Sequence, residues 1–149
     1  MPSDLCTRQV SIFLENRAGR LADVCWLLGD VGVNIRAFST AESSDWGIFR
    51  LIVSDPELAL KTLKEHSYAV SESDVLVVQL RDRPGGLAEV LTVLRDAKVA
   101  IEYMYAFVTP LEGQAIVILR VADQVIDSTI ATLQNAGIAI VEPQKVYSL

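Results

Sequence analysis

The stretch RAGRLADV at residues 17–24 returns as RPGGLAEV at residues 83–90, 66 positions further along the chain. The same offset relates further pairs of like residues, which are Leu28 and Leu94, Asp30 and Asp96, Val33 and Val99, Ile35 and Ile101, and Gly47 and Gly113. So many matches at one spacing indicate a duplicated unit, whereas a solenoid needs at least three repeats. The sequence therefore predicts two similar copies in tandem.

The first copy alternates between strand and helix signals. Apolar residues at positions i, i+3, i+4 and i+7 predict a helix, and these are Leu21, Val24, Cys25 and Leu28. Gly32 marks its end, because glycine readily adopts the left-handed conformation of a helix C-terminus. Asp55 and Pro56 suit the N-cap and first turn of a second helix. Strands are predicted at residues 10–14, 35–42 and 48–53 and from residue 68, with a turn at 43–47.

The second copy repeats this order. Its first helix is predicted by Leu87, Val90, Leu91 and Leu94. Its second helix begins at Asp123 and ends at Gly137. Strands are predicted at residues 75–80, 101–108, 115–120 and 138–141. The polar segment 71–74 joins the copies and leaves no room for a flexible linker.

Both copies follow the order βαββαβ, which is typical of a split βαβ fold with two helices on one face of an antiparallel sheet. The predicted class is α+β and ferredoxin-like, with one domain at residues 1–72 and another at residues 73–149. Each domain has only about 70 residues and buries a marginal core. Residues 75–78 and 116–119 are apolar on both faces, unlike an open sheet face. Either the two copies cover each other or a second chain covers them.

Composition narrows the classes of function. The 149 residues are too few for a multi-domain enzyme, and the net charge of −6 argues against a nucleic-acid partner. The hydrophobic share of 51% excludes disorder. No apolar run reaches the ~18 residues of a membrane span, so no membrane association is expected. The sequence shows no secretory signal and no CxxC or disulfide pattern, and the expected compartment is the cytoplasm.

The loop at residues 15–20, between the first strand and the first helix, suits a small polar ligand. Open backbone N–H groups and the positive end of a helix dipole favour a carboxylate. Gly19 lets a ligand approach the backbone, and Asn16 offers both a donor and an acceptor. Asn34 opens the next strand. By residue type alone, a structural role is an equal alternative, with Asn16 as an N-cap or turn former and Asn34 as a turn residue.

At these residues the sequence resembles a known family. ENRAGRL at 15–21 with GVNI at 32–35 resembles the opening of an ACT domain, and DRPGGL at 82–87 with VAIE at 99–102 resembles another. The resemblance spans residues 9 to 147 and is closest to small stand-alone proteins made of two ACT domains. It implies the βαββαβ fold. It also implies binding of a small molecule, most often an amino acid, between paired domains that control an enzyme or transporter.

The resemblance implies ligand contacts at the loop asparagine and glycine and at the asparagine that opens the second strand. The predicted ligand site comprises Asn16, Ala18, Gly19, Arg20, Leu21, Asn34 and Ile35. In paired ACT domains the loop of one domain faces the second strand of its neighbour, which here is either the other copy or another chain. In the second copy, Asp82 and Ala100 replace the two asparagines, so that site departs from the family pattern.

Other residues that could carry chemistry have simpler interpretations. His66, the single histidine, is expected to close the second helix, where a cation suits the dipole. Cys25 is expected in the core and Cys6 in a mobile N-terminal segment. Alternating aromatic residues favour packing between sheets or subunits over a ligand wall, and they are Tyr103, Tyr105 and Phe107. No catalytic residue, cofactor or metal site is expected.

These observations predict a non-catalytic sensor that binds a free amino acid and regulates amino-acid metabolism, as a homodimer. The alternative is a regulatory subunit that acts only in complex with a separate metabolic enzyme, because both would keep the ligand loop. A purely structural dimer ranks third. An enzyme would need a nucleophile, a metal or an acid–base pair, and the sequence shows none of these at motif spacing.

Overall fold

The structure is a computed structural model that describes residues 4–107 and 113–149. The chain divides into two compact units. The N-terminal unit comprises Arg8–Ser73 with Tyr147–Leu149, and the C-terminal unit comprises Asp74–Val146 with the segment that ends at Thr7. The domain ranges expected from the sequence, 1–72 and 73–149, remain a prediction. The compact units depart from these ranges mainly at the two ends of the chain.

The N-terminal unit follows the predicted βαββαβ order. In chain order it contains β1 (Thr7–Glu15), α1 (Arg20–Asp30), β2 (Ile35–Glu42), β3 (Trp46–Val53), α2 (Pro56–Glu65) and the first part of β4 (Ala69–Arg81). Its strands lie in the order β2-β3-β1-β4, and β1 and β2 each pair antiparallel with β3. This arrangement confirms the predicted fold class, with β2 at the edge of the unit's sheet.

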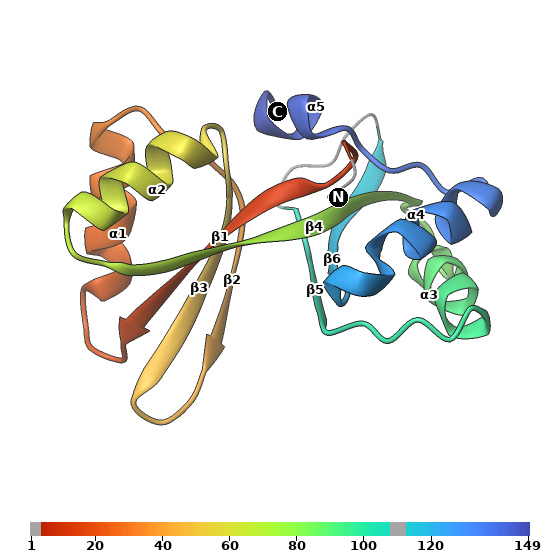
Figure 1. Ribbon diagram of the computed structural model, residues 1–149, viewed down its shortest axis with the longest axis horizontal. Helices are drawn as coiled ribbons and strands as arrows, with labels where there is room; N and C mark the ends of the chain where they lie inside the picture. The colour runs from red at the N-terminus through yellow and green to blue at the C-terminus, as the bar shows by residue number, and fades with distance from the viewer. Residues whose placement is uncertain (1–3, 108–112) are drawn as a thin grey trace. The chain divides into compact units, whose positions relative to one another are not determined.

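The core of the N-terminal unit lies between its sheet and its two helices, which cover the same face (Figure 1). Val24 and Leu28 are the buried residues of α1, and Leu60 and Leu63 are among those of α2. They pack against alternate strand residues, which are Val10, Ile12, Leu14, Phe49, Leu51 and Val53. Alternation along each strand places these side chains on one face.

Two predicted helix ends are confirmed. Gly32 has φ +81°, and the following Val33 N–H donates to Leu28 O at 3.0 Å, which is the hydrogen bond of a Schellman end. At the start of α2, the Asp55 side chain accepts from Leu58 N–H at 3.1 Å. These short-range signals fix where the helices stop and start.

The C-terminal unit repeats the plan with small changes. It contains the rest of β4, α3 (Gly86–Asp96), β5 (Tyr103–Ala106), β6 (Gln114–Arg120), a 3₁₀ turn η1 (Asp123–Val125), α4 (Ile126–Asn135) and α5 (Pro143–Tyr147), which ends in the N-terminal unit. Its strands lie in the order β4-β6-β5, all antiparallel. The strand predicted at 101–108 is shorter, and Val108 lies outside the described residues.

The prediction of two separate strands here, one from residue 68 and one at residues 75–80, is wrong, because β4 runs without interruption from Ala69 to Arg81. Residues 71–74 join the copies as part of this strand, without a flexible linker, and the two compact units meet between Ser73 and Asp74. The segment contains no glycine or proline that would end a strand. The last strand of the first copy and the first strand of the second are therefore one strand.

The strand predicted at residues 138–141 is also wrong. It is reduced to one antiparallel bridge between Ile140 and Val78. Gly137, with φ +75°, ends α4 just before it, and Pro143 begins α5 just after it. Too few residues remain between the two helices for a longer ladder.

Burial contradicts three expectations about single residues. Leu21 is 46% exposed and Cys25 is also exposed, although the helical stripe predicted both in the core. Cys6 is buried in the core of the C-terminal unit rather than mobile. The apolar strand segments 75–78 and 116–119 are buried throughout, as expected from their sequence. His66 caps α2, as predicted, with its N–H bonded to the carbonyls of Thr62 and Leu63.

The end of the chain is anchored on the N-terminal unit. The Arg36 guanidinium donates two hydrogen bonds, at 3.1 and 2.9 Å, to the carbonyl oxygen of Tyr147. Arg8 N–H donates to the Tyr147 hydroxyl at 2.9 Å. These bonds explain why the last residues belong to the compact unit formed by the first half of the chain.

Candidate functional site

The loop between β1 and α1 is held by its backbone. Asn16 N–H donates to Asp45 O at 3.0 Å, which ties the loop to the turn between β2 and β3. Gly19 is the N-cap of α1 in a left-handed conformation, with φ +86° and no side-chain cap. Among the described residues, the N–H groups of Ala18 and Gly19 have no acceptor. The positive end of α1 therefore presents open donors at this loop.

A cavity of about 80 Å³ opens beside this loop, at the ends of the three strands β1–β3. Its lining residues are Leu14, Glu15, Asn16, Arg17, Arg20, Leu21, Thr40, Glu42, Gly47, Ile48 and Phe49. Strand register brings them together, because Leu14 and Glu42 both lie opposite Gly47, and Thr40 lies opposite Phe49. The volume of this cavity is several times the ~10–15 Å³ that a cavity needs to hold one water molecule. The cavity has room for the charged end of an amino acid.

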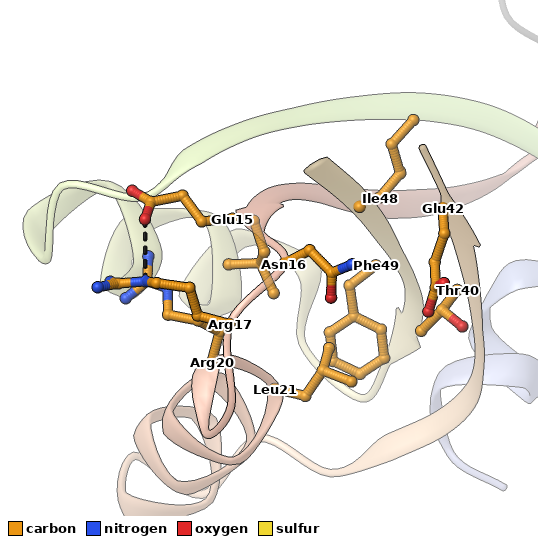
Figure 2. A pocket seen from close by; sticks show the side chains of 11 residues that line it. Glu15, Asn16, Arg17, Arg20, Leu21, Thr40, Glu42, Ile48 and Phe49 are labelled. Carbon is orange, nitrogen blue, oxygen red and sulfur yellow. Dashed lines mark ion pairs between the residues drawn. The ribbon is translucent and has the colours of Figure 1, made fainter. Parts of the chain in front are cut away.

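Figure 2 shows how the lining side chains lie. The Asn16 side chain points into the cavity, toward the side formed by Thr40 and Glu42 of β2. Leu21 and Phe49 form an apolar wall below it. The cavity thus combines an amide, a hydroxyl and a carboxylate, all of which can accept hydrogen bonds from an ammonium group.

The two arginines of the loop point away from Phe49 and the β2 side chains (Figure 2). Arg17 Nε lies 2.9 Å from a carboxylate oxygen of Glu15. Arg20 Cζ lies over the ring of Tyr68, 5.2 Å from its centroid. Arg20 Nε is buried and has no hydrogen-bond partner in the described part of the chain. The Arg20 guanidinium is therefore held as a cation over an aromatic ring.

The structure brings together some of the predicted site residues and separates others. Asn16, Arg20 and Leu21 line the cavity, and Ala18 and Gly19 belong to the same loop without lining it. These five residues therefore form one local group at the start of α1. The ligand contacts expected of them stay a prediction.

Asn34 and Ile35 lie at the other end of α1. The helix runs from Arg20 to Asp30, about 16 Å at ~1.5 Å per residue. Asn34 N–H donates to Ser54 Oγ at 2.9 Å, and Asn34 O accepts from Ser54 N–H at 2.8 Å. Within one unit, Asn34 therefore cannot reach a ligand held by Asn16. The prediction that Asn34 and Ile35 contact a ligand concerns the loop of a neighbouring domain.

Sequence reasoning missed the strand residues that complete the cavity, which are Leu14, Thr40, Glu42, Gly47, Ile48 and Phe49. Glu15 and Arg17 also line the cavity, and both belong to the loop at residues 15–20 that the sequence singled out, although neither is among the predicted ligand contacts. A signal for several of the strand residues existed, because the turn at residues 43–45 sets the register of the β2–β3 hairpin. Counting outward from it pairs Glu42 with Gly47 and Thr40 with Phe49. Alternation then places Thr40 and Glu42 on the same face as the loop end of β1.

The described part of the chain contains no group of three or more His, Cys, Asp or Glu side chains placed to hold a metal ion. Within residues 4–107 and 113–149, no helix is both long enough and apolar enough to cross a membrane.

Comparison with known proteins identifies the family. A family model described as an ACT domain pair matches residues 5–149. The structure is similar to that of protein BT0572 from Bacteroides thetaiotaomicron, with 38% identity, a TM-score of 0.90 and coverage of 99% of this chain and 100% of that chain. The chain belongs to the family of ACT domain pairs, as its loop motifs predict.

More distant structures share the fold. The ligand-free regulatory subunit of aspartate kinase from Thermus thermophilus matches with a TM-score of 0.64 and 13% identity, over 87% of this chain and 91% of that chain. The corresponding subunit from Thermus flavus matches with a TM-score of 0.60 and 13% identity, over 87% and 92%. No curated protein matches the sequence. The family match indicates a regulatory fold.

Proposed function

We propose that the protein is a non-catalytic sensor that binds a free amino acid at the Asn16 cavity of its N-terminal unit and thereby regulates amino-acid metabolism in the cytoplasm. The observation that carries this proposal is the Asn16 side chain, which points into a cavity beside the open N-terminus of α1 (Figure 2). The ACT domain pair supplies the regulatory context.

The cavity suits both charged groups of an amino acid. The open N–H groups of Ala18 and Gly19, with the positive end of α1, would hold the carboxylate. The side-chain oxygens of Asn16, Thr40 and Glu42 would accept from the ammonium group. Two charges are tolerated in a partly enclosed site only when both are hydrogen-bonded.

The size of the cavity sets a further condition. At about 80 Å³ it is well below the ~300–1,000 Å³ of typical ligand pockets. We infer that only the charged end enters it and that a neighbouring ACT domain covers the ligand's side chain, bringing Asn34 and Ile35 to the site. A homodimer would supply such a neighbour from a second chain, and the other copy would supply it within one chain.

The second candidate function is that of a regulatory subunit that works only with a separate metabolic enzyme. It is favoured by the likeness of the fold to the aspartate kinase regulatory subunits. Purification of the tagged protein from its host separates the two functions, because a subunit would copurify in stoichiometric amount with an enzyme whose activity then responds to the amino acid.

The test of the ligand site is a thermal-shift screen against the twenty amino acids, followed by calorimetry. A ligand present at 100 times its Kd raises the free energy of unfolding by about 2.7 kcal/mol, which gives a clear shift. Asn16→Ala removes a hydrogen-bonding side chain and should weaken binding by about 1–3 kcal/mol, tenfold or more. Asp82→Ala changes the corresponding position of the second copy and should leave the affinity unchanged. The proposed site is refuted if both variants weaken amino-acid binding equally, or if neither variant weakens it.

A further inference from the structure

A second and larger cavity lies wholly within the C-terminal unit, between the end of β4, the first turn of α3 and the turn after α4. Its volume is about 480 Å³, within the ~300–1,000 Å³ typical of small-molecule sites. Residues that line it include Gln79, Arg81, Gly86, Glu89, Gln114 and Ile138. The Asn16 cavity shares none of these residues.

Comparison of the two copies explains why this cavity exists. Arg20 and Gly86 are related by the repeat offset, and each is the first residue of its helix. Both follow a left-handed N-cap glycine, with φ +86° at Gly19 and +85° at Gly85. At one position the N-terminal unit carries a long cationic side chain, and the C-terminal unit carries none.

The facing position differs as well. Tyr68 and Ile138 each follow a residue with positive φ, and each donates its N–H to a helix carbonyl four residues before that residue, at 3.0 Å. In the N-terminal unit the Arg20 guanidinium reaches across to the Tyr68 ring. In the C-terminal unit Gly86 and Ile138 both line open space. The Arg–Tyr stack of one copy is thus replaced by a cavity in the other.

The cavity is fixed by the backbone. A Cβ atom on Gly86 would lie 1.9 Å from the carbonyl oxygen of Arg81, so no side chain can stand there without moving the chain. The segment that faces β4 makes only the bridge between Ile140 and Val78, so the ladder does not extend along Leu80 and Arg81. Gly86 therefore lets the chain at Arg81 pass close to the start of α3, and the missing strand leaves the space beside it.

The charges around the cavity favour a zwitterion. Glu89 lies 2.6 Å from the guanidinium of Arg83 and is neutralised by it. Arg81 lies opposite Gln114 in the β4–β6 register, and in the described part of the chain it has no ion-pair partner. On the other side, α4 ends at the cavity with no basic residue in its last turn. A carboxylate is favoured near Arg81 and an ammonium group near the C-terminal end of α4.

We propose that this cavity is a second binding site, in the C-terminal unit, for a small zwitterionic molecule of the free amino-acid class. It is independent of the Asn16 cavity and does not use the loop position where Asp82 departs from the family pattern. The protein then has two unlike sites per chain, one small and set beside an asparagine loop, the other larger and set beside Arg81.

The experiment is an amide NMR titration of the uniformly labelled full chain with each of the twenty amino acids at millimolar concentration. We expect at least one of them to shift the signals of Gly86 and Gly137, which line the cavity. Ala136→Trp places a bulky side chain at the edge of the cavity, and Arg81→Gln removes its cation. Each variant should weaken this binding at least tenfold. Matched controls are Ala97→Trp, at the C-cap of α3, and Arg95→Gln, an exposed arginine of α3, and both should bind as the unaltered protein does.

Failure of this site is distinguishable from failure of the proposed function. Asn16→Ala should abolish shifts at Gly19 and Gly47 and leave those at Gly86 and Gly137, and Arg81→Gln should do the reverse. The proposal is overturned if no amino acid moves Gly86 or Gly137, or if Ala136→Trp, with an otherwise unchanged spectrum, leaves the affinity intact. Succinate and ethylamine each carry only one kind of charge. An equal response to succinate would show an anion site and would refute the zwitterion.

Discussion

Arg20 borders the Asn16 cavity, and the ligand contact predicted for it would come from its backbone rather than from its guanidinium. Its side chain lines the Asn16 cavity, yet its guanidinium lies over the Tyr68 ring. We expect Arg20→Gln to lower the free energy of unfolding by about 0.5–1 kcal/mol, through loss of the cation–π contact, and to leave amino-acid affinity within a factor of a few.

Urea denaturation and calorimetry on the same samples test this, with Tyr68→Leu as the matched variant because it removes the other half of the contact. A tenfold loss of affinity in Arg20→Gln, with unchanged stability, would place the guanidinium on the ligand instead.

The two cysteines should differ in reactivity. Cys25 is exposed, but partial burial raises its pKa above the usual value of a thiol, and Cys6 is buried in a core. Because the reactive form is the thiolate, native protein near pH 8 should be alkylated at Cys25 alone, and more slowly than free cysteine. The rate should rise as the pH rises through the elevated pKa. Peptide mapping by mass spectrometry after timed alkylation is the measurement, and labelling of Cys6 without denaturant would contradict the buried placement.

Residue types predicted the helix α1 better than they predicted which of its residues are buried. The apolar spacing of Leu21, Val24, Cys25 and Leu28 correctly predicted a helix, but only Val24 and Leu28 are buried. Periodicity gives the direction of a helix face and not its width. The width depends on how far the sheet extends beneath the helix, and the sheet of this unit ends at β2. No spacing rule within α1 contains that information.

Substitutions at two glycines test where α1 ends. Gly32 has φ +81° and open space around it, so Gly32→Ala introduces backbone strain without a clash. We expect the free energy of unfolding to fall by about 1 kcal/mol. Gly29→Ala is the control, because Gly29 lies inside the helix in equally open space.

Alanine at Gly29 should instead raise stability by about 0.5–1 kcal/mol, since glycine is a poor helix former. Urea denaturation of both variants gives the two values, and a destabilised Gly29→Ala or an unaffected Gly32→Ala would contradict the assigned helix end.

Elements bounded by strong local signals could be predicted from the sequence. The turn predicted at residues 43–47, Gly32 and the Asp55-Pro56 pair correctly marked the end of β2, the end of α1 and the start of α2. The turn is shorter than predicted, because β3 already begins at Trp46. The strand between Gly137 and Pro143 could not be predicted in this way, because whether a short apolar segment forms a ladder depends on its partner β4. The same limit applies to the larger cavity, which results from that missing ladder beside a glycine at position 86.

At the scale of the whole molecule, the apolar strands do not by themselves require a second chain. Residues 75–78 and 116–119 are already buried in the single chain. The stronger argument for assembly is the distribution of exposed large hydrophobic residues. Among the described residues these are Phe13, Leu21, Trp26, Val31, Phe38 and Trp46 in the N-terminal unit and Leu87 in the C-terminal unit.

This asymmetry predicts that the expected homodimer forms through the N-terminal unit. Phe38 is 53% exposed and lies on β2, the edge strand of that unit. Trp26 is 73% exposed and lies on α1, the helix that precedes β2 in the chain. Such residues favour burial against a partner. Sedimentation velocity at micromolar concentration should therefore give twice the chain mass of 16.3 kDa.

A charge at the edge strand tests which unit forms the interface. Phe38→Lys should convert the dimer to a monomer, because dimerisation would then bury an unpaired ammonium group. Leu87→Lys is the matched control, since Leu87 occupies the position of Leu21 in the second copy and is 41% exposed. It should leave the dimer intact. A monomer of 16.3 kDa for the unaltered protein would refute the homodimer, and dissociation by Leu87→Lys alone would move the interface to the C-terminal unit.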